Sequence, residues 1–363
     1  MHLSQKIVKI YGIPHNSEGV RMKDILFPGS RIIKTAVAIF LTAWICELLN
    51  WPPVFAVITA IVTIEPTVTD SIRKGIVRFP ASAIGSAYAV LFISLFGNSP
   101  ITYTLAAFFT IATCYKLNLH AGLVVATLTA VAMIEVIHNN YVIAFFIRLG
   151  TTTIGLVVST VVNLFVLPPD YKEDILTNIR SIRKKTGTVI EKVFTDLLQN
   201  KHEEDMVDRK LMKQLNKKLQ QTKTLARFQQ DEARFHPLIE SEKKLFQRMQ
   251  QTLTHIQLIL YHLDNLINTP IKRISWTVEE RQLIIQAVQS LADGMKNPNH
   301  FDPVKHDLQL NILMQLFWED NQEMIQATDK HPTRFPPELI ILYELLSIYS
   351  LVLRFYREAE KNQ

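Results

Sequence analysis

The sequence predicts an all-α protein with a membrane half and a charged helical half. Only nine Asp, Glu, Lys or Arg residues occur between Thr35 and Leu167, and none lies between Ala81 and Tyr115. From Pro168 onward, charged residues recur every few positions. A soluble core cannot absorb about 130 residues of such apolarity in long runs, whereas a lipid bilayer can. The fold class is therefore a polytopic membrane protein with a cytoplasmic α-helical bundle.

We divide the 363 residues into three parts. Residues 1–30 form a cytoplasmic N-terminal segment, residues 31–167 a six-span transmembrane domain, and residues 168–363 a cytoplasmic helical domain. The first thirty residues lack the short apolar run and the small-residue cleavage site of a signal peptide. We therefore expect the first span to act as its own insertion signal.

Six apolar segments form the membrane half, and the charges between them set its orientation. The loops at 50–52, 97–100 and 138–140 contain no Lys or Arg, whereas the other loops carry Arg73, Lys74 and Lys116. The flanking tails are also basic, with Lys23 before the spans and residues 180–185 after them. The positive-inside rule then places both termini in the cytoplasm. The predicted spans are 32–49, 53–65, 77–96, 101–115, 119–135 and 141–167.

Two of these segments are short for a membrane span. Residues 53–64 and 121–134 fall below the roughly 20 residues that a straight helix needs to cross the hydrocarbon. A re-entrant arrangement would place Arg73 and Lys74 outside the membrane, against the charge rule. We therefore expect both segments to span.

The membrane half contains an internal repeat. AVITAIVTIE at 56–65 matches ATLTAVAMIE at 126–135, and the same offset of seventy residues pairs Arg78 with Arg148. Charged residues are rare in this half, so their matching favours a true duplication of residues 31–97 and 101–167. Each copy has three spans, and an odd number inverts the second copy in the membrane. Inverted 3+3 repeats are typical of secondary transporters.

Each repeat ends its second span on an acid and carries an arginine in its third span. An arginine inside the bilayer costs several kcal/mol unless it is paired or faces a wet cavity. The geometry permits the pairs Glu65–Arg78 and Glu135–Arg148, one near each membrane face. These are either structural ion pairs or parts of an anion pathway. In the second interpretation, the residues that line the pathway are Arg78, Arg148, Glu65, Glu135, Thr151 and Thr152.

Other positions admit two interpretations each. The threonines Thr151 and Thr152 either serve close helix packing or line the path with hydroxyl groups. At the cytoplasmic face, Arg31 and Lys34, like Arg73 and Lys74, either anchor the chain or attract anions.

Three stretches together resemble a known family: GSRIIKTAVAIFL at 29–41, PVFAVITAIVTIEPTVTDSI at 53–72 and GIVRFPASAIGSA at 75–87. They are similar to the aromatic acid exporter and fusaric-acid-resistance-like membrane family over about residues 29–100. The resemblance implies outward movement of aromatic or other organic anions, and a homodimer of six-span chains. Two positions depart from the family pattern, because Glu65 stands for a glutamine and Pro80 for a glycine. The matching residues are Arg31, Lys34, Pro66, Thr67 and Arg78.

The second half of the chain is predicted as long helices at 171–199, 204–233, 237–268, 277–296, 304–328 and 336–359. Their apolar residues recur at three-, four- and seven-residue steps, which indicates an amphipathic helical bundle. The basic cluster at 180–185 is either a solvated helix face or a contact with anionic headgroups of membrane lipids.

Signatures of enzymes and cofactors are missing from the sequence. Gly187 and Gly294 are the only glycines after Pro168, so no Gly-rich phosphate-binding loop can form there. The histidines are scattered and the cysteines Cys46 and Cys114 lie in apolar runs. We therefore expect no metal, no cofactor, no nucleic-acid partner and no enzymatic activity.

The function that we expect from the sequence is export of organic anions across a bacterial inner or plasma membrane. Two alternatives stay open: a passive anion channel of the same fold, and a membrane-anchored scaffold acting through its cytoplasmic helices.

Overall fold

The structure is a computed structural model that describes residues 29–136, 140–199, 206–269, 271, 274–327 and 336–360. These residues form α-helices and two short 3-10 helices, with no strand among them, which confirms the all-α prediction. The contacts divide the chain into two compact units, Met1–Pro169 and Asp170–Gln363. The predicted N-terminal segment, except Gly29 and Ser30, and the loop residues His138 and Asn139 lie outside the described residues.

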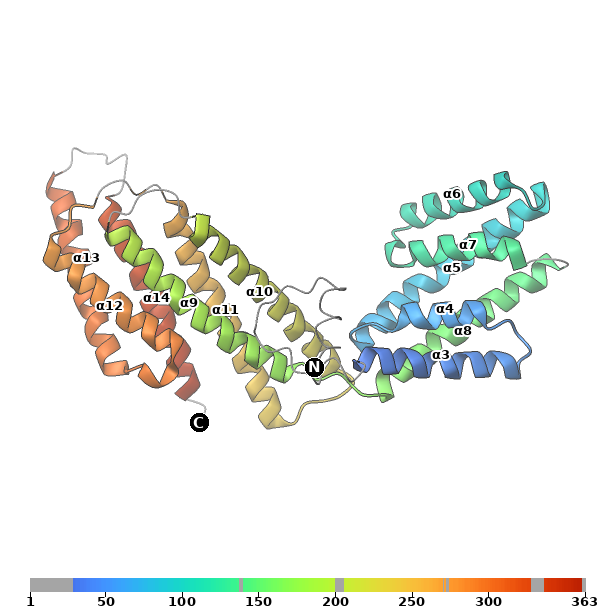
Figure 1. Cartoon of the computed structure of the whole chain (residues 1–363), viewed down its shortest axis with the longest axis horizontal. Helices are drawn as coiled ribbons and strands as arrows, with labels where there is room; N and C mark the ends of the chain where they lie inside the picture. The colour runs from blue at the N-terminus through green and yellow to red at the C-terminus, as the bar shows by residue number, and fades with distance from the viewer. Residues whose placement is uncertain are drawn as a thin grey trace, which may run out of the picture. The chain divides into compact units, whose positions relative to one another are not determined.

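Among its described residues, the first unit has six α-helices, with a 3-10 turn before the fifth of them (Figure 1). The helix α4 has 10 residues and α7 has 14, so α4 is only about 15 Å long. The helices are α3 (Ser30–Leu48), α4 (Val54–Thr63), α5 (Val68–Phe96), α6 (Pro100–Lys116), η1 (His120–Gly122), α7 (Leu123–Val136) and α8 (Tyr141–Phe165).

The helix boundaries in this unit follow from local chemistry. The Thr67 side chain accepts a hydrogen bond from the Asp70 amide at the start of α5, and Ser99 caps α6 in the same way ahead of Pro100. The helices α3 and α6 end the same way, because Asn50 and Asn118 take positive φ values of 55° and 57°.

The contacts made by α3, α4 and α5 match those made by α6, α7 and α8. The helix α3 packs on α4 and α8, while α6 packs on α7 and α5; the pairs α4–α8 and α7–α5 also match (Figure 1). Burial matches in the same way, since the buried residues of α3 and α6 are Lys34 and Thr102, Ala38 and Ala106, Thr42 and Thr110, and Cys46 and Cys114.

The central contact of the first unit lies between α5 and α8, which run antiparallel. Near one end, the Asn163 side chain donates to Ser71 Oγ at 2.9 Å. Near the middle, the hydroxyl oxygens of Ser82 and Thr152 lie 3.4 Å apart, and these residues are 70 positions apart in the chain. The α5 residue with the higher number therefore contacts the α8 residue with the lower number, so the two helices run antiparallel. At their crossing, Ser82 faces Thr152, the residue 70 positions later in the sequence.

Two glycines allow the close approach of neighbouring helices. A Cβ atom on Gly85 would lie 2.4 Å from the Ala126 carbonyl oxygen, and one on Gly155 would lie 2.4 Å from the Ala56 carbonyl oxygen. Glycine is required at both positions because backbone atoms occupy the space of a side chain. Gly85 and Gly155 lie 70 positions apart in the sequence, and so do their partners Ala56 and Ala126.

The described residues of the second unit form a bundle of six α-helices with its own apolar core, which includes Ile182, Phe194, Ile256 and Tyr349. The prediction of long amphipathic helices holds for this unit, because each helix buries one apolar stripe. The helices are α9 (Lys172–Leu198), α10 (Met206–Glu232), α11 (Glu240–Asn268), α12 (Val278–Lys296), α13 (Pro303–Ala327) and α14 (Pro337–Glu360).

By length and composition, three of the described helices could cross a membrane: Val68–Phe96, Tyr141–Phe165 and Pro337–Tyr356. The third, α14, belongs to the second unit and packs there on α11, α13 and α12. A helix that is covered by protein on several sides is apolar for that reason alone.

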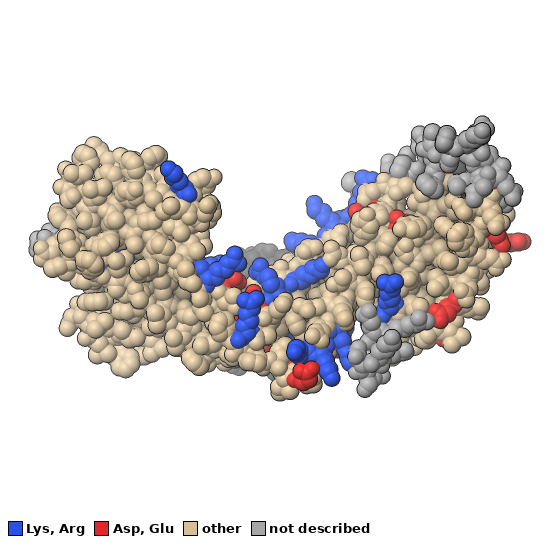
Figure 2. All heavy atoms as spheres, turned by 180° about the vertical axis from the view of Figure 1, so that it is seen from behind, with Lys and Arg blue, Asp and Glu red and all other residues tan. Residues whose placement is uncertain are grey.

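Charged side chains are distributed unevenly over the molecule. On the face shown in Figure 2, the surface of the first unit is almost entirely without charged groups, whereas Lys and Arg side chains gather on the second. Large apolar side chains are exposed on the first unit instead, including Ile76, Val142 and Phe165. Such a surface is unfavourable in water and suits a lipid environment.

Candidate functional site

Two buried arginines of the first unit are the candidate functional groups. Arg78 lies about 15 Å into α5 and Arg148 about 10 Å into α8. Both side chains are nearly inaccessible, since the residues are 7% and 3% exposed. A buried guanidinium group must be compensated by partners, so the contacts of each arginine indicate its role.

Arg78 is bonded through all three of its nitrogens. Its Nη2 forms an ion pair with Glu65 Oε1 at 2.8 Å, Nη1 donates to the Val62 carbonyl at 3.1 Å, and Nε donates to the Ala121 carbonyl at 3.3 Å. The Glu65–Arg78 pair that the sequence predicts is therefore present. Lys74 completes it, because its Nζ lies 2.8 Å from the other carboxylate oxygen of Glu65.

The acid reaches Arg78 because the chain breaks directly after α4. The helix ends at Thr63, Ile64 is extended, and Pro66 cannot continue the helix. The freed backbone groups are satisfied by α5, since the Glu65 amide donates to Ser71 Oγ at 3.3 Å and that hydroxyl donates to the Thr63 carbonyl at 2.9 Å. This break holds the Glu65 carboxylate over the first turns of α5.

A buried amide joins this region to α3 and α8. The Asn163 side chain is completely buried and donates to the Glu65 carbonyl at 3.1 Å as well as to Ser71. Its Oδ1 accepts from Lys34 Nζ at 2.7 Å. The polar network therefore ties three helices together around the break after α4.

The set of four basic residues expected at the cytoplasmic face divides into two kinds. Arg31 and Arg73 are exposed, as the expectation requires. Lys34 is 3% exposed and bonded to Asn163, and Lys74 is engaged with Glu65. Lys34 thus differs from Arg31 and Arg73 in being buried, because its place on the buried stripe of α3 turns it toward α8.

Arg148 is bonded far less completely than Arg78. Its Nη2 donates to Thr129 Oγ1, and the guanidinium carbon lies 4.4 Å from the centre of the Phe55 ring. Its Nε and Nη1 have no hydrogen-bond partner among the residues that the structure describes. The three N–H groups on Nε and Nη1 are therefore unused among the described residues.

The expected partnership of Glu135 with Arg148 is not formed. The Glu135 carboxylate is exposed and accepts a hydrogen bond from the Tyr103 hydroxyl of α6. Although Glu65 and Glu135 lie 70 residues apart in matching stretches of sequence, only Glu65 forms an ion pair with its arginine. The two arginines are thus in different electrostatic states.

The threonines Thr151 and Thr152 serve the helix backbone. Their hydroxyls donate to the Arg148 carbonyl at 3.0 Å and 2.8 Å, and both residues are 1% exposed. Thr152 also contacts Ser82 at the crossing of α5 and α8. Both contacts agree with the packing interpretation of this stretch.

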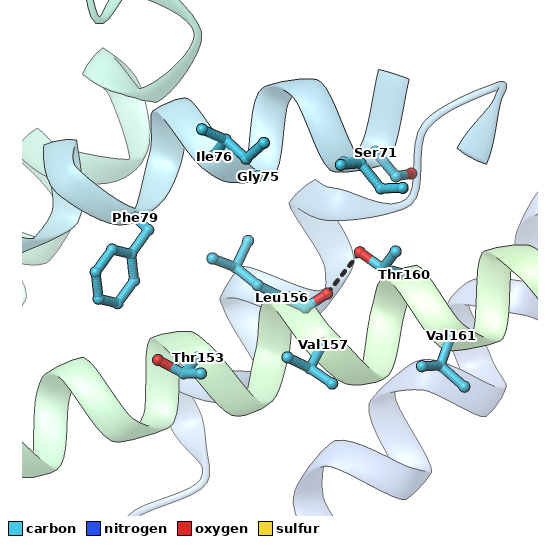
Figure 3. Close-up of a pocket in the computed structure, with 10 residues that line it drawn as sticks. Ser71, Gly75, Ile76, Phe79, Thr153, Leu156, Val157, Thr160 and Val161 are labelled. Carbon is cyan, nitrogen blue, oxygen red and sulfur yellow. Dashed lines mark hydrogen bonds between the residues drawn. The ribbon is translucent and has the colours of Figure 1, made fainter. Parts of the chain in front are cut away.

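The first unit has a groove of about 600 Å³ between α5 and α8 (Figure 3). Ile76 and Phe79 of α5 face Leu156 and Val157 of α8 across it, and the Thr160 hydroxyl donates to the Leu156 carbonyl at 2.7 Å. Neither arginine lines this groove. Because its walls are apolar and open, the groove suits a lipid chain better than an anion.

Sequence reasoning missed three residues of the site. Asn163 could have been found, because it is a single amide inside the apolar run VVNLFV. Phe55 and Thr129 carry no such signal, since phenylalanine and threonine are ordinary in apolar helices. Among the described residues, no group of three or more His, Cys, Asp or Glu side chains could hold a metal ion.

Comparison with known proteins gives two results. Residues 26–166 match the family model described as aromatic acid exporter family member 1. A UPF0421 protein of Oceanobacillus iheyensis is 45% identical over 94% of this chain and 99% of its own length. A UPF0421 protein of Bacillus cereus strain ZK is 41% identical over 92% and 94%, and one of Staphylococcus haemolyticus is 40% identical over 89% and 95%.

Proposed function

The chain belongs to the UPF0421 family and its residues 26–166 match the aromatic acid exporter family model, and from this we propose that it exports aromatic or other organic anions across a bacterial cell membrane. The family name and the apolar helices of the first unit together indicate a membrane transporter. The substrate class and the direction of flux are inferred from the family name.

The proposed membrane domain has six spans arranged as a 3+3 inverted repeat. The matching contacts of α3–α5 and α6–α8 support the repeat, and the antiparallel course of α5 and α8 supports its inversion. The short helices α4 and α7 hold equivalent places, as broken helices do in inverted-repeat transporters. By the positive-inside rule, the charges of the loops support a cytoplasmic location for both termini.

The second unit is proposed to be a cytoplasmic domain. Although α14 qualifies as a span by composition, its fully buried Tyr349, Leu345 and Ile348 pack into the core of that unit. The Tyr349 hydroxyl donates to the Ala287 carbonyl of α12 at 2.6 Å. A helix bonded in this way to its neighbours does not present a surface to lipid.

The incompletely bonded guanidinium of Arg148 is the observation that carries the proposed function. A buried cation with three unused N–H groups costs free energy that folding does not recover. A substrate carboxylate would satisfy these donors, and each charge-assisted hydrogen bond contributes about 1.5–3 kcal/mol. We assign Arg148 as the group that binds the anion.

In alternating access, Arg78 and Arg148 would exchange their states, so that the paired arginine becomes unpaired and the unpaired one becomes paired. In this structure Arg78 is paired with Glu65, whereas Nε and Nη1 of Arg148 have no hydrogen-bond partner among the described residues. In the exchanged state, Glu135 would pair with Arg148 and release the anion, while Arg78 would lose Glu65. A proton gradient or the membrane potential would drive the cycle, because the charged half lacks a Gly-rich nucleotide-binding loop.

The test begins with a deletion strain grown on a panel of aromatic and aliphatic acids. The acid that wild-type protein protects against best is then used for flux measurements in proteoliposomes. The Arg148→Gln variant should lose at least about tenfold in flux, from the loss of one charge-assisted bond. Lys116→Gln, which changes an exposed cation at the end of α6, is the matched control and should transport normally.

Thermal unfolding separates this role from a structural one. Arg148→Gln should melt at or above the wild-type temperature, because it removes a buried and partly unsatisfied charge. Arg78→Gln should melt lower, since it leaves the Glu65 carboxylate with only Lys74. Wild-type flux in Arg148→Gln would refute the assignment.

A further inference from the structure

The helix α13 is apolar on two faces, although only one of them packs on the second unit. The helix lies at the edge of that unit and contacts α14 and α12 (Figure 1). Leu313 and Phe317 face the core there. On the opposite side of the helix, Val304, Leu308 and Trp318 are 79%, 61% and 53% exposed. An exposed apolar stripe of this kind marks a surface that another molecule covers.

The exposed face has the spacing of a seam between two helices. Its residues recur at alternating steps of four and three positions, which is the pattern by which two helices pack along each other. The seam consists of these residues, all of them exposed: Val304, Leu308, Asn311, Gln315, Trp318 and Gln322. At a rise of about 1.5 Å per residue, it is about 27 Å long. The exposed Ile312 and Met314 extend the apolar surface on its two sides.

The charges of α13 fit a second protein helix better than a membrane surface. Helices that lie on membranes are rich in lysine and arginine. From Pro303 to Gln322, α13 has one lysine and three acidic residues. In addition, the amides of Asn311 and Gln315 lie in the middle of the seam, where acyl chains would leave them without hydrogen-bond partners. A helix that presents amides at the same height would satisfy them.

We propose that α13 is a self-association surface, at which two copies of the chain pair through antiparallel α13 helices. When the two helices are centred at residue 313, Leu308 faces the partner's Trp318 and Asn311 faces the partner's Gln315. Such an interface is symmetric, so each of these contacts occurs twice. Apolar contacts then flank a central set of amide contacts, and a polar position within a seam fixes the register of the two helices.

A lysine and a glutamate beside the seam favour the antiparallel direction. In that arrangement Lys305 lies next to the partner's Glu319, and symmetry forms this ion pair twice. Both side chains are exposed. The Glu319 carboxylate accepts a hydrogen bond on Oε1 from Gln315 of its own helix at 2.8 Å, so Oε2 can accept from the lysine. In a parallel pair, the lysine and the glutamate would lie about 21 Å apart along the helix axis.

The proposed surface is independent of the proposed transport. It uses residues of the second unit alone, and the family resemblance, which implies a homodimer, assigns no surface to it. A contact between two helices over about 27 Å is narrow, and interfaces well below the standard area of about 1,600 Å² are typically weak. We therefore expect a dimer that dissociates on dilution.

Cross-linking of the full-length protein in proteoliposomes tests the pairing. Ile312 lies beside the centre of the seam, so it would be close to the partner's Ile312. A short bis-maleimide should therefore join Ile312→Cys chains into dimers, and dilution with lipid should lower the yield. Asn216→Cys, which changes an exposed residue of α10, is the matched control and should not be cross-linked. The native Cys46 and Cys114 are buried and remain in both variants.

Exchange of the two charges tests the direction of the helices. In the Ile312→Cys protein, Lys305→Glu alone should lower about tenfold the lipid dilution at which half of the cross-linking is lost, because two attractions become repulsions. Glu319→Lys alone should have the same effect, and the two changes together should restore the original yield. Lys213→Glu, which reverses an exposed cation of α10, should change nothing.

Absence of cross-linking in Ile312→Cys, or equal cross-linking of Asn216→Cys, would overturn the proposal. A yield that neither single charge reversal alters would overturn it too, since the chains would then pair through another surface. Rescue by the double variant separates loss of pairing from misfolding, because a second charge reversal does not repair a misfolded chain. Single variants that lose cross-linking without such rescue would overturn the antiparallel arrangement. None of these measurements involves flux, so failure of the proposed function would leave them unchanged.

Discussion

Replacing Gly155 by alanine tests the close contact on which the Arg148 site is built. The added Cβ would lie 2.4 Å from the Ala56 carbonyl oxygen and 2.9 Å from Thr59 Cβ. Close carbon–oxygen contacts in proteins are about 3.3–3.6 Å. The helices α4 and α8 must therefore separate by about 1 Å, because the obstructing atoms are backbone and cannot rotate away.

The expected cost follows from this overlap. Overpacking typically destabilises a protein by about 1–3 kcal/mol. For a domain of about 150–250 residues, 1 kcal/mol lowers the melting temperature by roughly 2–4 °C, so a fall of roughly 2–12 °C is expected. Phe55 precedes Ala56 on α4 and lies over the Arg148 guanidinium, so flux should fall as well.

Two other glycines provide an internal comparison. Gly85→Ala should destabilise by a similar amount, since its Cβ would lie 2.4 Å from the Ala126 carbonyl oxygen. Gly75→Ala is the control, because its Cβ would make an ordinary 3.6 Å contact with a Leu156 methyl group. The assay is thermal unfolding of the purified chain in non-ionic detergent. Wild-type melting of Gly155→Ala would show that the α4–α8 contact is not as close as described.

Two further predictions concern polar contacts of the two units. Lys34→Met should lower the free energy of unfolding by about 1–3 kcal/mol, because Asn163 Oδ1 loses its donor. Arg31→Gln, which changes an exposed side chain, should change it by less than about 0.5 kcal/mol. Equal melting temperatures of the two variants would contradict the buried role of Lys34. In the second unit, the hydrogen bond from Lys172 lowers the pKa of Glu242. This contribution to stability is present at neutral pH and is lost as the pH falls through the folded pKa, so the melting difference between wild type and Glu242→Gln should shrink below about pH 4. A melting difference that does not change with pH would refute this prediction.

Helix positions were predictable from the sequence to within a few residues, except that α5 begins at Val68, nine residues before the predicted span 77–96. In the first unit the long apolar runs indicate the helices, and in the second unit the recurrence of apolar residues three and four positions apart does so. The end of α4 was predictable to within two residues, because Pro66 cannot continue a helix.

The partners of the buried charges were predictable only in part. Glu65 and Arg78 lie close together in sequence on either side of one break, so local geometry brings them together. Glu135 and Arg148 occupy equivalent positions, yet Glu135 contacts Tyr103 and Arg148 contacts Thr129 and Phe55. The repeat specifies similar positions but does not force both halves into the same conformation.

The sequence by itself determined the division into an apolar and a charged half, the helices and the rarity of charges in the apolar half. Only the tertiary structure decided that Lys34 is buried, that Asn163 joins three helices, and that Nε and Nη1 of Arg148 have no partner among the described residues. The physical reason is one of range. Helix formation depends on neighbours within about four residues, whereas the environment of a buried charge is set by side chains that come from distant helices.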